Sequence, residues 1–247
     1  MKPIYKPSGA AKEYGGLALN IYTGCPHNCY YCYGPKVLHK QKNDFHSIVE
    51  PRKNIIEETK KQIERENITG ELIHLCFTCD PYPKGYDNSV TREIIKVLKD
   101  SGNNVQILTK NGLDAMRDFD LLNEDDWFGI TYAGYNGYSF DKNYIPVEEP
   151  NAGTPHYRLK ALKIAHEKGI NTWVSAEPVL VPEDILSLLE FADYVDVWKV
   201  GKLNYYPSNT DWKKFGHLVN NILYKKKEKG LIKGYYIKDS LQKEMCM

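Results

Sequence analysis

The segment at residues 22–35 reads YTGCPHNCYYCYGP and carries three cysteines, Cys25, Cys29 and Cys32. Its glycines, prolines and asparagine favour turns, so we predict a loop, and the apolar run at residues 17–22 before it predicts a strand. Three thiolates on one short loop can bind three irons of a cubane cluster. Because no fourth cysteine lies close to them in the sequence, the fourth iron is left open for a substrate or cofactor.

A zinc site is the alternative interpretation of the same loop. In it, the three cysteines would share a tetrahedral ion with either His27 or His39. Structural zinc loops usually bring their ligands in two separated pairs, whereas here three cysteines crowd into one loop. The pattern therefore favours an iron–sulfur cluster, and a zinc-stabilised binding module remains the non-enzyme alternative.

Composition sets broad limits on the class of protein. The chain has 247 residues, 42% of them hydrophobic, and its 33 Lys and Arg nearly balance its 32 Asp and Glu. These values are ordinary for a globular fold and give no global reason to expect a polyanionic partner. No apolar stretch approaches the roughly 20 residues that span a bilayer, and the N-terminus lacks a signal-peptide pattern. We therefore expect a cytoplasmic protein without a membrane partner, whose six cysteines serve as ligands or thiols.

The rest of the chain alternates short β-branched or aromatic runs with longer segments of helical period. This alternation is typical of βα units around a parallel sheet. We predict one α/β domain over residues 1–247, with its core at about 17–241 and the cluster loop at 22–35. Such units build a complete or partial (β/α) barrel or an open doubly wound sheet, and both collect reactive groups at the carboxyl ends of the strands. The predicted strands are residues 17–22, 72–78, 104–109, 127–132, 171–176, 194–200 and 234–238.

The cysteine loop resembles the hallmark of the radical S-adenosylmethionine (SAM) superfamily, C-x3-C-x-Φ-C, with Tyr31 as the aromatic residue Φ. The resemblance implies a partial (β/α)6 TIM-type barrel and a [4Fe–4S] cluster held by Cys25, Cys29 and Cys32. It implies that the open iron chelates SAM, whose reductive cleavage gives a 5′-deoxyadenosyl radical that abstracts hydrogen from a substrate. It also implies an electron donor of the flavodoxin or ferredoxin class.

Further along, the chain is similar to the spore photoproduct lyase-related branch of that superfamily. The resemblance gives Tyr31 a role in cofactor contact and Tyr33 a role in hydrogen relay, and it places Thr78 and Asp80 near SAM. Phe77 stands where the lyase has its hydrogen-donating cysteine. Cys79 lies two residues later, on the same face of an extended strand, and is our candidate donor. A small buried thiol is the alternative for Cys79.

Three more positions complete the expected cofactor pocket. Lys110 matches a Thr-Lys element whose lysine meets the SAM carboxylate, with a plain surface lysine as the alternative. Thr131 fits a hydroxyl position near SAM. Glu177, just past a predicted strand, could bind the ribose of SAM or the substrate. The turn that begins at Glu149 also resembles the branch, although the sequence gives this carboxylate no chemical role. Polar residues after the last strands are candidates for gripping a substrate, namely Lys199, Lys202, Asn204 and Lys238.

The substrate is open at this point. Resemblance to the lyase suggests a nucleic-acid base or a pyrimidine dimer in DNA, yet the charge balance is not distinctly basic. A radical SAM enzyme that acts on a small molecule, a nucleotide or a peptide is the alternative.

Overall fold

The computed structural model describes residues 2–246, which form one eight-stranded sheet in the order β1 to β8. Strand β1 runs antiparallel to β2, and every later neighbour pair is parallel. The seven parallel strands confirm the predicted βα alternation, while β1, only two residues long, was not predicted. The strands are Ile4–Tyr5 (β1), Leu17–Leu19 (β2), Leu72–Leu75 (β3), Asn104–Thr109 (β4), Trp127–Thr131 (β5), Asn171–Ala176 (β6), Val197–Val200 (β7) and Gly234–Ile237 (β8).

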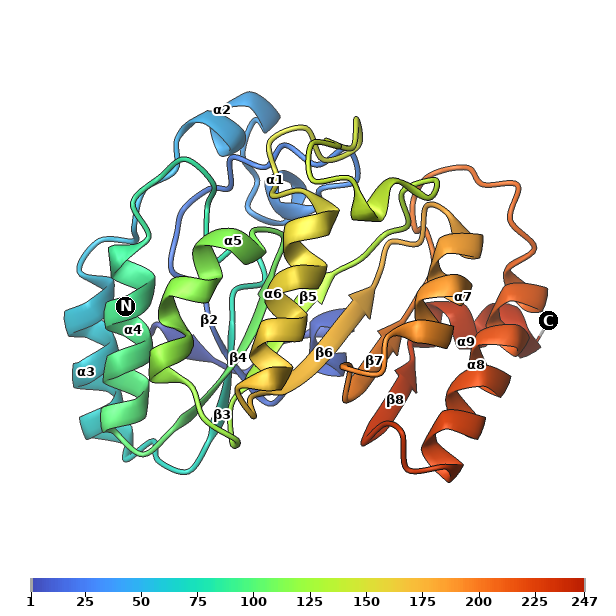
Figure 1. Ribbon diagram of the computed structural model, residues 1–247. Coiled ribbons are helices and arrows are strands. Elements are labelled where there is room, and N and C mark those ends of the chain that lie inside the picture. The colour runs from blue at the N-terminus through green and yellow to red at the C-terminus, as the bar shows by residue number, and fades with distance from the viewer. Residues whose placement is uncertain (1, 247) are drawn as a thin grey trace.

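The helices lie between the strands and cover one face of the sheet, as Figure 1 shows for α4, α6 and α7. Helices α6 and α7 begin at Pro155 and Pro182, where proline fits the first turn because it lacks the N–H that a helix start leaves unpaired. The α-helices are Gly34–Val37 (α1), Lys42–Ser47 (α2), Ile55–Glu66 (α3), Ser89–Asp100 (α4), Gly112–Ala115 (α5), Pro155–Glu167 (α6), Pro182–Phe191 (α7), Trp212–Glu228 (α8) and Asp239–Cys246 (α9). The 3₁₀ helices are Gly9–Glu13 (η1), Met116–Leu121 (η2) and Tyr138–Phe140 (η3).

The strand order decides between the two architectures that the sequence left open. A doubly wound sheet reverses its strand order at a switch point, whereas here spatial order follows chain order from β1 to β8. The sheet is therefore a partial barrel, with β1 and β8 at its two edges. Within the described residues, no helix is long and apolar enough to cross a membrane.

The two faces of the sheet differ in what they bury. Phe128 and Ile130 of β5 belong to the apolar core that lies under the helices. On the inner face, the Trp173 indole lies over Gly129, where an added Cβ would sit 2.3 Å from the ring. Only glycine leaves room for this tryptophan, whose Nε1 donates to the carbonyl oxygen of Ile107 at 3.0 Å.

The N-terminal segment fills part of the barrel interior. The Tyr14 ring lies 5.7 Å from His74 and 5.9 Å from Trp173, and its hydroxyl is 3.0 Å from Ser175 Oγ. Beside it, Glu13 Oε1 accepts a hydrogen bond from the Asp239 backbone N–H at 3.0 Å. Residues 13–14 thus connect β3 and β6 to the chain just after β8, and the dark blue N-terminal part of the ribbon passes behind β6 in Figure 1.

Candidate iron–sulfur and cofactor site

The cysteine loop leaves β2 at the carboxyl edge of the sheet and is braced by α2. Cys25 N donates to the carbonyl oxygen of Phe45 at 3.1 Å, and His46 Nδ1 is 2.8 Å from the Cys25 oxygen. A Cβ on Gly24 would lie 2.4 Å from that same Phe45 oxygen and 2.5 Å from the Ile48 oxygen. Glycine is therefore required just before the first cysteine, because the backbone of α2 approaches too closely for any side chain.

The three cysteines on this loop are free thiols, and Cys29 is buried while Cys25 and Cys32 are partly exposed. Burial raises the pKa of all three, that of Cys29 to about 12 even though Lys110 opposes the rise. The thiols are therefore protonated in the absence of a metal. Each sulfur becomes a thiolate when a metal replaces its proton. In the described part of the chain, no three His, Cys, Asp or Glu side chains are grouped closely enough to hold a single metal ion. A cubane binds each thiolate at a different iron.

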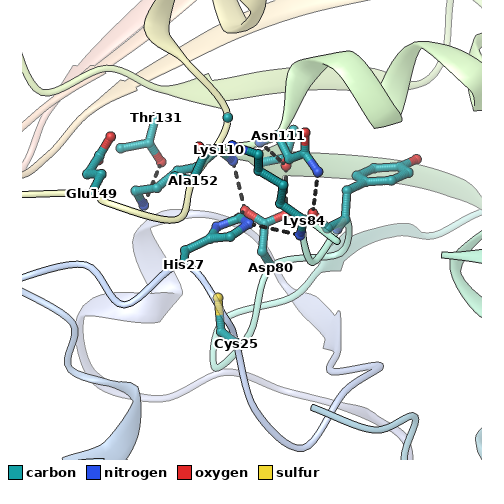
Figure 2. A network of polar contacts seen from close by, with 12 residues as sticks. Cys25, His27, Asp80, Lys84, Lys110, Asn111, Thr131, Glu149 and Ala152 are labelled. Atoms are coloured by element: carbon teal, nitrogen blue, oxygen red, sulfur yellow. Dashed lines mark hydrogen bonds and ion pairs between the residues drawn. The ribbon is translucent and has the colours of Figure 1, made fainter. Parts of the chain in front are cut away.

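His27, the first candidate for a fourth zinc ligand, has partners on both ring nitrogens. Its Nδ1 lies 3.5 Å from Asp80 Oδ2, and its Nε2 accepts the Lys84 backbone N–H at 3.3 Å. Burial lowers the pKa of His27 to about 4, so the ring is neutral and holds the loop after β3 in place (Figure 2). The donor set that remains on the loop is the three thiols, which fits a cubane with one open iron.

Asp80 connects the ends of β3 and β4. Its Oδ1 accepts hydrogen bonds from Tyr82 N at 2.9 Å and Thr109 Oγ1 at 2.6 Å, and its Oδ2 accepts the Lys110 N–H at 2.8 Å. Figure 2 shows this carboxylate between His27 and Lys110. Both oxygens are engaged by the protein, so the geometry fits a residue that positions Lys110. Direct contact of Asp80 with a cofactor stays a prediction.

Lys110 and Thr131 lie together at the ends of β4 and β5. Lys110 Nζ is 3.4 Å from Thr131 Oγ1, a long hydrogen bond, and 5.5 Å from the centre of the Tyr31 ring. Burial lowers the pKa of Lys110, but the charges of Cys29 and Glu149 outweigh it and raise the pKa overall. The ammonium group therefore stays charged next to the cysteine loop and can bind a carboxylate.

Thr78 carries a buried polar atom that fits a missing ligand. Its backbone N–H donates to Asn20 Oδ1 at 3.0 Å, whereas its hydroxyl is buried and finds no partner among residues 2–246. Buried hydroxyls in folded proteins are normally hydrogen-bonded. This orphaned hydroxyl fits the cofactor-pocket position that we predict for Thr78.

Sequence reasoning missed the most buried ion pair of the site. Glu149 and Arg158 are both fully buried and joined by a salt bridge, and the Glu149 carboxylate also accepts the hydroxyls of Tyr31 and Tyr135. Burial raises the pKa of Glu149, but Arg158 and then Lys110 outweigh burial and lower it. We call Tyr31, Lys110, Tyr135, Glu149 and Arg158 the cluster-side network. The signal that could have revealed this ion pair is the position of Arg158 beside apolar residues in a segment of helical period.

Glu177 belongs to a second group of charges. It pairs with Lys238 and accepts hydrogen bonds from Asn204 Nδ2 at 3.1 Å and from the Tyr14 hydroxyl at 3.5 Å. Lys199 Nζ donates to the backbone oxygens of residues 13 and 14 at 2.7 and 3.2 Å. The structure therefore places Glu177 among protein partners, and its predicted contact with ribose would have to compete with them. We call the group Glu13, Tyr14, Glu177, Lys199 and Lys238 the lumen network.

The two predicted catalytic residues lie in different surroundings. Half of Tyr33 is exposed, and its hydroxyl donates to the Phe77 carbonyl oxygen at 2.5 Å. The premise that put Cys79 on the same strand face as Phe77 is wrong, because β3 ends at Leu75 and the chain bends after it. The Phe77 ring stacks on His74 at 4.2 Å, whereas Cys79 contacts the apolar core. A donor role for Cys79 stays a prediction without that support.

Exposed aromatic side chains form a rim beside the cysteine loop. Tyr205 is 94% exposed, and Lys36 Nζ lies 5.8 Å from the centre of its ring. The neighbouring Tyr206 donates its hydroxyl to the Tyr30 carbonyl oxygen at 3.0 Å, with the two rings 4.4 Å apart. The loop between β7 and α8 therefore reaches across to the cysteine loop.

Several solved structures have folds similar to that of this chain. Spore photoproduct lyase, in a variant bound to AdoMet and dinucleoside spore photoproduct, is 12% identical with a TM-score of 0.65, over 94% of this chain and 78% of that one. Streptococcus suis SuiB bound to its precursor peptide SuiA is also 12% identical, with a TM-score of 0.64 over 93% and 50% of the two chains. At these identities the likeness concerns the fold, which confirms the partial barrel.

Curated relatives are closer in sequence. The uncharacterized protein ORF301 of Acidianus two-tailed virus is 29% identical over 204 residues, 74% of this chain and 65% of the relative. The uncharacterized protein Rv2578c of Mycobacterium tuberculosis is 26% identical over 180 residues, 70% of this chain and 52% of the relative. The chain thus spans between about half and two thirds of the length of these relatives.

The family model of the Radical SAM superfamily matches residues 19–195, which run from the end of β2 through α7 and contain the whole cysteine loop. This match and the three free thiols on the loop after β2 lead to one conclusion. The chain belongs to the radical SAM superfamily, whose enzymes use a [4Fe–4S] cluster and S-adenosylmethionine.

Proposed function

We propose that this radical SAM enzyme abstracts a hydrogen atom from a nucleic-acid base, with a pyrimidine dimer in DNA as the leading candidate. When bound, the reduced cluster supplies the electron that cleaves SAM to methionine and a 5′-deoxyadenosyl radical. The observation that carries the choice of substrate is the aromatic rim beside the cysteine loop, formed by Tyr30, Tyr205 and Tyr206. The fold shared with a lyase whose structure holds a dinucleoside photoproduct supports the same choice.

Tyr205 has the features of a stacking residue. Its backbone has φ of +67°, a conformation that costs a bulky residue about 1–3 kcal/mol and is often kept for function. Its ring is almost fully exposed, and Lys36 adds a cation beside it. Stacking of a base on an aromatic side chain contributes roughly 1–3 kcal/mol, and a lysine at the same place can meet a phosphate.

The chain's own residues prepare the pocket for this chemistry. We assign Lys110 and Thr131 to the carboxylate end of SAM and Thr78 to a polar group of the same cofactor. Glu149 fixes the Tyr31 hydroxyl, so this ring can serve as a rigid wall beside the loop. We also assign Tyr33, whose side chain is half exposed, to hydrogen-atom exchange with a bound substrate.

Deuterium transfer tests the substrate class directly. The anaerobically reconstituted enzyme is incubated with SAM, a reductant and either deuterated nucleic acid or deuterated peptide and small-molecule extract. We expect deuterium in 5′-deoxyadenosine or SAM from the nucleic-acid arm. Transfer only from the peptide or small-molecule arm would replace the proposed substrate. A Cys29→Ala variant, left with two thiols on the loop, should show no cluster and no cleavage in either arm.

Substitution at the rim tests how the substrate is held. Tyr205→Ala should weaken binding of a single-stranded oligonucleotide by roughly 5- to 150-fold, because one stacking contact is lost. Tyr224→Ala is the matched control, since Tyr224 is also an exposed tyrosine but lies on α8. Equal affinities for the two variants would remove the rim from substrate binding.

For the electron donor we propose an acidic protein of the flavodoxin or ferredoxin class. The segment that packs on the cysteine loop carries several exposed lysines, and the charge of Lys42 lowers the pKa of Cys32 against the effect of burial. Lys42→Glu should slow cluster reduction by a protein donor several-fold while leaving reduction by a small chemical reductant unchanged. Lys225→Glu, on α8, is the control and should change neither rate.

A further inference from the structure

Two cysteines outside the cluster loop form a C-x2-C pair, Cys76 and Cys79, directly after β3. Both are free thiols, and they lie close enough for each to shift the pKa of the other. The Cys76 sulfur also accepts the Ile21 backbone N–H at 3.5 Å, and the Tyr22 backbone lies near enough to Cys79 to lower its pKa. The pair therefore holds two successive residues of the chain that leads from β2 into the cysteine loop.

The backbone at Cys76 brings the two sulfurs together. In an extended strand, residues three apart point to opposite faces and lie roughly 10 Å from each other. Cys76 instead has φ of +113°, a conformation rarely adopted by a residue with a side chain, and this turn ends β3. Such strain costs about 1–3 kcal/mol and persists where the surrounding structure requires it. Here it places two thiols close together.

We propose that Cys76 and Cys79 are a redox-active dithiol that closes to a disulfide and thereby lowers SAM cleavage at the adjacent pocket. The oxidant is a small-molecule disulfide such as oxidised glutathione. Cys79, the more exposed thiol, loses its proton and attacks one sulfur of the oxidant, which releases one glutathione thiolate. Cys76 then loses its proton and attacks the Cys79 sulfur, which expels the second thiolate. Two protein thiols are oxidised, and one disulfide is reduced to two thiols.

The asymmetry of the pair supports these roles. Burial raises the pKa of both thiols, but for Cys79 the interactions with Cys76 and with the Tyr22 backbone outweigh burial and lower the pKa. Cys79 is thus the attacking thiol and Cys76 the buried resolving thiol. Thr78 lies between them and Asp80 follows, so closure pulls on the segment that positions Lys110. Closure also removes the interactions of both sulfurs with the backbone of residues 21–22, where the chain enters the cysteine loop.

The experiment uses the anaerobically reconstituted holoenzyme and oxidised glutathione. After incubation, free thiols are alkylated in acid, and the peptide that contains residues 76–79 is weighed. We expect it to carry an internal disulfide and no alkyl group, while Cys246, an exposed thiol, carries a mixed disulfide with glutathione. Cys76→Ser should trap a stable mixed disulfide on Cys79, because the resolving thiol is gone. Two alkylated thiols in the 76–79 peptide, at a dose that modifies Cys246, would overturn the proposal.

SAM cleavage is the second readout and rests on the radical SAM assignment. Oxidised enzyme should cleave SAM at least tenfold more slowly, and dithiothreitol should restore the rate. Oxidised glutathione should not lower the rate of a Cys76→Ser/Cys79→Ser double variant relative to the same variant without oxidant, and Cys246→Ser, the control, should respond like the original chain. Closure without any change in cleavage would overturn the regulatory role. Reduced enzyme that cleaves no SAM would count against the proposed function instead, because the peptide mass reports the dithiol independently.

Discussion

The cluster-side network and the lumen network both bury charge inside one barrel, but they do so in different ways. In the first, Glu149 and Arg158 are fully buried and pair with each other at the cysteine loop. In the second, Glu177 keeps a fifth of its side chain exposed and shares Lys238 with Glu13. The first network joins residues of three loops and one helix, whereas the second joins the N-terminal segment to the ends of β6, β7 and β8.

The difference shows what each network contributes. A buried ion pair is costly to break, because removal of one partner leaves the other charged and unsolvated. The cluster-side network therefore fixes the wall of the cofactor pocket rigidly. The lumen network has spare partners and partial access to water, so it tolerates the loss of one group. We expect substitutions to separate the two networks by the size of their effects.

Glu149→Ala should give the largest effect. It leaves Arg158 buried without a carboxylate, which costs about 3–5 kcal/mol of unfolding free energy. Glu177→Ala should cost clearly less, because Lys238 keeps Glu13 at 3.2 Å. Thermal unfolding of both anaerobically prepared variants measures the difference. Equal losses would mean that the two networks do not differ. A Glu149→Leu/Arg158→Met double variant should regain part of the loss.

Lys110→Met should reduce SAM affinity while leaving the cluster intact. A hydrogen bond to a charged group contributes about 1.5–3 kcal/mol, which corresponds to roughly 10- to 150-fold in the dissociation constant. Lys238→Met, in the lumen network, is the matched lysine substitution and should change SAM affinity little. Iron content and SAM binding are measured on the same samples. If both variants lose affinity equally, the cofactor contacts both networks.

The pH dependence of stability should reveal Lys199. Burial, then the charge of Lys238, lowers its pKa in the fold to about 8. At pH values between this lowered pKa and the ordinary lysine pKa, the Lys199 amine is protonated in the unfolded chain but largely neutral in the folded chain. The free energy of unfolding therefore rises with pH across this range. The gain from this group should be on the order of 1–2 kcal/mol between about pH 7.5 and 9.5. The melting temperature of the original chain relative to Lys199→Met should therefore increase with pH, and parallel curves would refute the shift.

Tyr14→Phe should have the smallest effect. The substitution removes a hydroxyl that lies 3.0 Å from Ser175 Oγ and accepts a hydrogen bond from Lys238 at 2.9 Å. Both partners keep other contacts nearby, so we expect a loss of about 0.5–1.5 kcal/mol. Tyr135→Phe, in the cluster-side network, should cost more, because Arg158 and Glu149 both lose a fully buried partner. A larger loss of stability for Tyr14→Phe than for Tyr135→Phe would contradict the proposed difference between the two networks.

Much of the fold could be predicted from the periodicity of apolar residues and from helix-capping residues. The βα alternation gave all seven parallel strands, because each apolar run is bounded by turn residues and followed by a helical pattern. The extent of β3 was predicted too long, since the positive φ at Cys76 leaves no mark in the sequence. Strand β1 was missed because its two residues, Ile4 and Tyr5, are too few to show an alternation of apolar and polar side chains. The connection between the two edges of the sheet depends on residues that lie more than 200 positions apart in the sequence, such as Asp239 and Glu13.

The candidate site could be predicted only where a local motif exists. The three cysteines and Lys110 follow strand ends and Thr131 ends β5, so topology alone brings them to one edge. Arg158 was missed because a charged residue on a helix is normally exposed, and its buried partner lies on a distant loop. Tyr14 was missed because nothing in its neighbourhood predicts that an N-terminal segment enters the barrel. Long-range pairing of buried charges is thus the part that local sequence does not encode.

The position of Tyr14 limits the route by which a reactant reaches the radical. The Tyr14 ring lies against Trp173, and its hydroxyl contacts Ser175 and Lys238, so the chain itself fills part of the interior beside β6 and β8. The space left for a reactant lies toward the cysteine loop, where Tyr206 contacts Tyr30. Removal of the Tyr14 side chain would therefore enlarge the barrel interior.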